Sequence, residues 1–93
     1  MFETQITALN AIREEVHTTL YDGRMRTRPF YWNGDKKRFT ATLGGMCLDE
    51  NEKKAFKAIF SKHGLKMKYQ EGRNEVSIWI AVDDPGLEKG GKL

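Results

Sequence analysis

Residues 65–82 read LKMKYQEGRNEVSIWIAV, and this stretch decides the fold. Two runs of alternating apolar and polar residues flank EGRN, which is a pattern typical of a β-hairpin. With a loop at 71–74, the expected cross-strand pairs are Tyr69 with Val76, Met67 with Ile78 and Leu65 with Ile80. One face of this hairpin is then apolar and holds Leu65, Met67, Tyr69, Val76, Ile78, Ile80 and Val82. The other face holds Lys66, Lys68, Gln70, Glu75, Ser77, Trp79 and Ala81.

A second hairpin is predicted upstream, where residues 24–39 read RMRTRPFYWNGDKKRF. Pro29 is incompatible with a helix interior, and Asn33-Gly34 is a strong turn signal. A loop at 33–36 would pair Phe30 with Phe39. A tighter turn at Asn33-Gly34 would pair Phe30 with Lys37 and divide the apolar set, so the apolar pattern favours the longer loop. That register puts Phe30, Trp32, Phe39, Ala41 and Leu43 on one face, and Tyr31, Arg38, Thr40 and Thr42 on the other.

Two helices are predicted, one before each hairpin. In the first, apolar residues recur at steps of three and four: Phe2, Ile6, Leu9, Ile12, Val16 and Leu20. We expect Thr4 as its N-cap, a stop at Asp22-Gly23, and Arg13, Glu14 and His17 on its solvent side. In the second, Asp49 and Glu52 have the spacing of a capping box, and Lys62-His63-Gly64 is a common C-terminal ending. Its apolar stripe holds Ala55, Phe56, Ile59 and Phe60.

The order helix, hairpin, helix, hairpin predicts the α+β class. The simplest arrangement is a four-stranded antiparallel sheet with both helices packed on one face, although the pattern leaves open whether the two hairpins join. With 93 residues, the chain is long enough for one domain. We expect that domain at 1–82, followed at 83–93 by a tail that contains proline and glycine.

Composition narrows the possible functions. The formal net charge of +3 is mildly basic, and no apolar run is long enough to span a membrane. Cys47 is the only cysteine, which fits a cytoplasmic protein, and we expect it to be a small buried residue. Neither His17 nor His63 has a metal-ligand spacing, so no metal site and no cofactor are predicted. We expect His17 to be solvated, and His63 to complement the end of its helix.

If both helices cover the apolar face of the sheet, the other face is open to solvent. It would present Tyr31 and Trp79 beside Arg38, Lys66 and Lys68. Further cations are expected at the hairpin tips (Lys36, Lys37 and Arg73) and before the first strand (Arg24, Arg26 and Arg28). Exposed aromatic rings beside cations favour binding of nucleic acid, single-stranded or RNA, because rings stack on bases and cations pair with phosphates.

Other functions stay open. Tyrosine, tryptophan and arginine are also the residues enriched at protein interfaces, so the alternative is a protein-binding inhibitor or adaptor, and a homodimer is possible. Such small proteins are common in phages and mobile elements, where they act on host nucleic-acid-handling or defence complexes. Catalysis is not expected, and RNA cleavage by His63 is the weakest alternative. Contact with phosphates through the second helix is also possible, since that helix carries Lys53, Lys54, Lys57 and Lys62.

Overall fold

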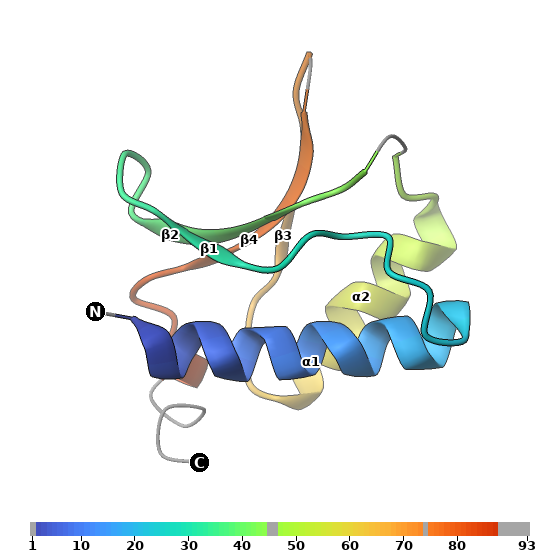
Figure 1. The fold of residues 1–93 in the computed structure, drawn as a ribbon, viewed down its shortest axis with the longest axis horizontal. Helices are drawn as coiled ribbons and strands as arrows, with labels where there is room; N and C mark the ends of the chain where they lie inside the picture. The colour runs from blue at the N-terminus through green and yellow to red at the C-terminus, as the bar shows by residue number, and fades with distance from the viewer. Residues whose placement is uncertain (1, 45–46, 74, 88–93) are drawn as a thin grey trace.

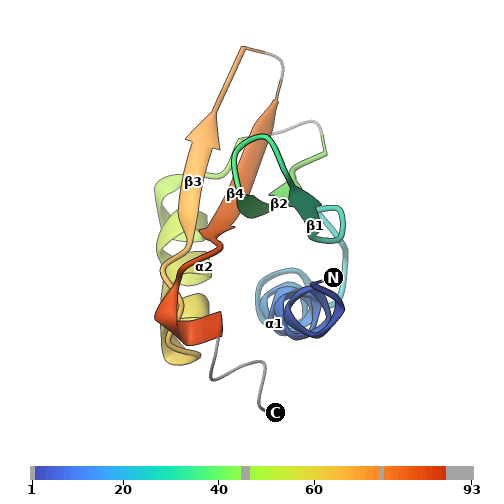
Figure 2. The ribbon, with the colours of Figure 1, turned by 90° about the vertical axis from the view of Figure 1, so that its left-hand side faces the viewer.

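The computed structural model describes residues 2–44, 47–73 and 75–87. The elements follow the predicted order: α1 (Glu3–Tyr21), β1 (Tyr31–Asn33), β2 (Arg38–Thr42), α2 (Glu50–Lys62), β3 (Lys68–Glu71) and β4 (Val76–Ala81). The four strands form one antiparallel sheet in the order β1-β2-β4-β3, so the two hairpins join through β2 and β4. Both helices pack against the same face of the sheet (Figures 1 and 2). The predicted α+β class and arrangement are confirmed.

The core lies between the sheet and the two helices. The predicted apolar face of the first hairpin is confirmed, because Phe30, Phe39, Ala41 and Leu43 are buried and Trp32 packs against the core. The second hairpin behaves in the same way, with Leu65, Met67, Ile78 and Ile80 buried. Val82 is an exception, since it follows the end of β4 and is exposed.

Both hairpin registers differ from the predicted ones by two residues. Phe39 pairs with Trp32 rather than with Phe30, and Tyr69 pairs with Ile78 rather than with Val76. In the first hairpin the loop comes one residue later, at 34–37, because Asn33 serves as the last strand residue and its Oδ1 accepts a hydrogen bond from the Lys36 N–H at 3.2 Å. A shift of two residues keeps every side chain on its face, so the predicted faces hold although the pairs were wrong.

The helix ends are predicted correctly at three of four places. α1 stops at Asp22 and Gly23, which both have positive φ, and the capping box of Asp49 and Glu52 is present at the start of α2. α2 also ends as expected, at His63 followed by Gly64 with φ 79°. The predicted N-cap Thr4 was wrong, because α1 already begins at Glu3 after Phe2. The ring of Phe2 packs 4.5 Å from that of Trp32, and this contact holds the first turn in place of a side-chain cap.

The residues after β4 pack onto the domain as far as the structure describes them. Asp84 Oδ2 accepts a hydrogen bond from the Lys66 N–H at 2.8 Å, and Leu87 belongs to the core cluster. The folded unit therefore includes residues 83–87, the described part of the segment expected as a tail.

Candidate nucleic-acid interface

The candidate site is the open face of the sheet, opposite the helices. Strand register places Tyr31 beside Thr40, Thr40 beside Trp79, and Trp79 beside Lys68. These four residues form one row across all four strands. Tyr31 is 43% exposed at one edge, and Lys68 is exposed at the other. The sequence therefore predicted the two aromatic rings on one face, and the structure places them in one row with a threonine between them.

Arg38 covers the middle of this row. Its guanidinium carbon lies 4.1 Å from the centroid of the Trp79 ring, which is a close cation–π contact. Its Nη2 donates a hydrogen bond of 2.6 Å to Gln70 Oε1, and Gln70 belongs to the far edge strand β3. The side chain thus reaches across β4. One side of the Trp79 ring is occupied by Arg38, so Trp79 is half-buried rather than open as expected.

The tips of the two hairpins border this face and rise away from the helices (Figure 1). A groove of about 350 Å³ lies there. Arg38 and Thr40 lie in the groove, and its cations Lys36, Arg38 and Arg73 outnumber its one carboxylate, Glu75. The full lining is Tyr31, Asn33, Lys36, Arg38, Thr40, Gln70, Gly72, Arg73, Glu75 and Ser77. Sequence reasoning assigned no role to Thr40, Gln70 and Ser77, although the alternation of β2, β3 and β4 had placed them on this face.

The other predicted cations lie around the face or away from it. Lys37 is exposed at the first hairpin tip, where its φ is 53°, and Lys66 is exposed just before β3. Arg24 and Arg28 are exposed on the α1–β1 connection. Arg26 differs from these, because its Nη1 is paired with Glu52 Oε2, which also accepts a hydrogen bond from the Tyr21 hydroxyl. Burial and this Glu52 partner together raise the pKa of Tyr21 to about 12. Arg26 therefore joins the α1–β1 connection to α2.

His17 is not solvated, as was expected, but completely buried. Its Nδ1 donates to the Arg13 carbonyl at 2.7 Å, and its Nε2 accepts from the Thr27 N–H at 3.2 Å. Arg13 was also expected in solvent and is buried, with its Nε donating to Thr27 Oγ1 at 2.9 Å. The reason is the connection 22–30, which folds over this side of α1 and supplies polar partners. With both ring nitrogens engaged and no exposed surface, His17 is a structural residue.

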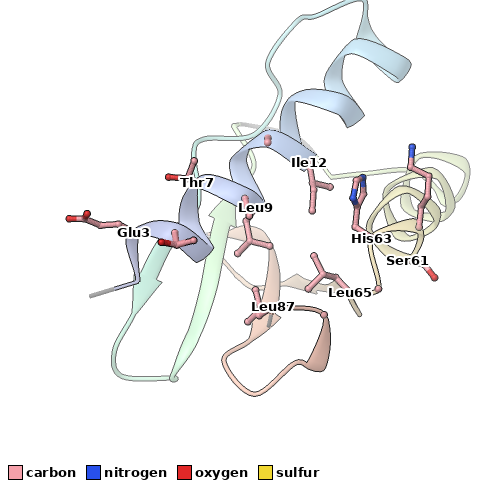
Figure 3. Close-up of a pocket in the computed structure, with 14 residues that line it drawn as sticks. Glu3, Thr7, Leu9, Ile12, Ser61, His63, Leu65 and Leu87 are labelled. Carbon is pink, nitrogen blue, oxygen red and sulfur yellow. The ribbon is translucent and has the colours of Figure 1, made fainter. Parts of the chain in front are cut away.

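His63 lies at the edge of a second groove, between α1, the end of α2 and residues 86–87. Its Nε2 is 2.9 Å from Glu15 Oε1, and Glu15 Oε2 accepts from Lys62 Nζ at 2.5 Å. The groove encloses about 900 Å³. Figure 3 shows that its apolar side chains point toward one another; these are Leu9, Ile12, Leu65 and Leu87.

Cys47 corrects another expectation, since its side chain is exposed rather than buried. Hydrogen bonding to the Glu71 carboxylate is the main cause that raises the pKa of this thiol. Cys47 lies just before α2, outside the groove on the sheet face.

Two further observations concern only the described residues. Within them, no cluster of three or more histidine, cysteine, aspartate or glutamate side chains is arranged to hold a metal ion. Neither α1 nor α2, nor the helical turn that begins at Pro85, has the length and apolar character needed to cross a bilayer.

Comparison with known proteins gives no relative for this chain. No family model, no curated protein and no solved structure matches it significantly.

Proposed function

We propose that this protein is a non-enzymatic, cytoplasmic nucleic-acid-binding protein that holds a single strand, RNA in preference, on the open face of its sheet. The observation that carries the proposal is the row of Tyr31, Thr40, Trp79 and Lys68 with the guanidinium of Arg38 lying over Trp79. Aromatic rings and arginine planes are the surfaces on which proteins stack unpaired bases.

The charges around the row suit a strand that crosses it. Lys36 and Arg73 come from the two opposite hairpin tips, and Lys68 lies at the edge of the sheet beside Trp79. A strand that crosses the face from tip to tip would meet cations at both ends and aromatic rings in the middle. A pocket of about 350 Å³ has the size of a site for one small ligand, which favours an unpaired nucleotide over a duplex.

The test is fluorescence anisotropy with labelled RNA and DNA single strands of equal sequence. The variants are Tyr31→Ala and Trp79→Ala, and the control is Met25→Ala, which removes an exposed apolar side chain on the α1–β1 connection. We expect micromolar binding by the wild type and a loss of about tenfold for each ring, because stacking contributes about 1–3 kcal/mol per base. Wild-type levels of binding by both ring variants, with folding verified by circular dichroism, would contradict the proposal.

The alternative is a protein-binding inhibitor or adaptor of the kind that phages encode. The observation that favours it is the apolar groove of about 900 Å³ between α1 and α2, which could take a hydrophobic segment of a partner (Figure 3). Salt separates the two functions. Nucleic-acid binding weakens steeply with salt, whereas binding in an apolar groove depends on salt only slightly.

A further inference from the structure

Two buried polar atoms on the open face have no hydrogen-bond partner among the described residues. They are the Nε of Arg38 and the Oγ1 of Thr40. Thr40 is only 3% exposed. Buried polar groups are almost always paired in folded proteins, so two such atoms two residues apart on one strand indicate a site that is incomplete without a ligand.

Arg38 covers the part of the open face that Trp79 forms. Its guanidinium lies over the Trp79 ring and donates a hydrogen bond to Gln70 Oε1 on the edge strand β3. Thr40 lies between Tyr31 and Trp79 in the row, two residues from Arg38 on the same face of β2. A ligand can therefore reach the Thr40 hydroxyl only if a neighbour moves. Of these neighbours we take Arg38 as the one that moves, because its side chain is held by one hydrogen bond to Gln70 and by its contact with the Trp79 ring.

Three groups would become available if Arg38 moved aside: the ring of Trp79, the hydroxyl of Thr40 and the guanidinium itself. A ligand that contacts all three groups at once must offer a flat π-system, a hydrogen-bonding edge and an anion. A nucleotide supplies all three, as base face, base edge and phosphate. An acidic peptide without aromatic residues supplies the anion and hydrogen-bonding groups but no flat π-system.

We propose that Trp79 and Thr40 form a base-binding subsite that Arg38 closes in the free protein, and that a nucleotide opens it by drawing the guanidinium onto its phosphate. This inference rests on the proposed function, which supplies the ligand class. It adds that Thr40 contacts the base edge and that Gln70 is a positioning residue that holds the closed state.

Thr40→Val tests the contact to the hydroxyl, with Thr42→Val as the matched control on the same strand and face, outside the groove. Because none of the described residues gives the Thr40 hydroxyl a hydrogen bond, thermal unfolding of Thr40→Val should occur at or above the wild-type temperature. Affinity for a labelled single-stranded RNA should nevertheless fall by about fivefold, the equivalent of one hydrogen bond. Thr42→Val should bind as the wild type does. Equal affinity of Thr40→Val and Thr42→Val would overturn the proposal.

Gln70→Ala tests the closed state, with Gln5→Ala on α1 as the control. Removal of the 2.6 Å hydrogen bond should release Arg38 without any change of charge, and RNA should then bind about fivefold tighter. The fluorescence of Trp79 without RNA, measured in a Trp32→Phe background, should change in Gln70→Ala and not in Gln5→Ala. Unchanged or weaker binding by Gln70→Ala would contradict the closed state.

The outcomes separate this inference from the proposed function. If the wild type binds no single strand, both fail. If the wild type binds and the ring variants lose binding, but Thr40→Val and Gln70→Ala behave as the wild type, the face binds nucleic acid and the Arg38-covered subsite does not exist.

Discussion

The Nδ1 of His17 lies 2.7 Å from the carbonyl oxygen of Arg13, one helical turn earlier, and both side chains are buried. A carbonyl can only accept, so Nδ1 carries the proton and Nε2 is left to accept from the Thr27 N–H. The imidazole is therefore neutral. Desolvation by burial lowers the pKa of His17 below its ordinary value of 6.5, and the nearby charges of Arg13 and Arg26 act in the same direction.

This relationship predicts that acid destabilises the fold. The unfolded chain takes up a proton near pH 6.5 and the folded chain does so only at lower pH. The free energy of unfolding therefore does not depend on His17 protonation above pH 6.5. Below pH 6.5 it decreases as the pH falls, by at most about 1.4 kcal/mol per pH unit. Urea unfolding between pH 5 and 7.5 should show this decrease, and His17→Gln should remove it while His63→Gln retains it. A slope that persists in His17→Gln would assign the effect to another group.

Glu52 should contribute more stability than Glu50, its neighbour in the first turn of α2. Glu52 caps the helix, pairs with Arg26 and accepts from Tyr21, whereas Glu50 is exposed and reaches only Lys53. We expect Glu52→Ala to lower the free energy of unfolding by about 2 kcal/mol, and Glu50→Ala by less than about 0.5 kcal/mol. Glu52→Gln keeps the capping box and should fall between them. Equal losses for Glu52→Ala and Glu50→Ala in chemical denaturation would mean that the contacts of Glu52, including its pair with Arg26, add nothing to stability.

Cys47 should be slow to react although it is exposed. The Glu71 carboxylate is the main cause that raises the pKa of Cys47, and only the thiolate is nucleophilic. Glu71→Gln should therefore speed the reaction with a disulfide reagent at pH 8 several-fold. Glu75→Gln, which removes a carboxylate in the same hairpin, is the control and should leave the rate unchanged. The reverse order of the two rates would contradict this account.

Gly86 should tolerate no side chain. A Cβ at this position would lie 2.2 Å from the carbonyl oxygen of Gly64 and 2.6 Å from its carbon, both in the backbone. Gly86→Ala must therefore displace the segment after β4, and we expect a loss of about 1–3 kcal/mol in chemical denaturation. Gly34→Ala is the matched control, since its Cβ would approach nothing closer than 3.5 Å. An unchanged unfolding midpoint for Gly86→Ala would show that residues 83–87 do not pack on the domain.

The faces of the strands could be predicted because alternation is insensitive to small errors. Tyr31, Thr40 and Trp79 stay on the open face under any register that differs by two residues. The burial of Arg13 and His17 could not be predicted from α1 alone. A helical periodicity reports the polarity of the residues of the helix, whereas these two side chains find partners on the connection 22–30. Arg38 is a similar case, because its contact with Gln70 spans 32 positions and depends on the order in which the strands join in the sheet.

The salt dependence of binding should locate the phosphate path. On the proposed path, Lys36 and Arg73 contact phosphates, so Lys36→Gln and Arg73→Gln should each reduce the slope of log Kd against log salt by about 0.7. Lys54 and Lys57 are exposed on α2, on the opposite side of the sheet, and Lys54→Gln and Lys57→Gln should leave the slope unchanged. All four changes remove one charge, so a general effect of net charge would reduce the four slopes alike. A decrease confined to the α2 variants would move the binding surface from the sheet to that helix.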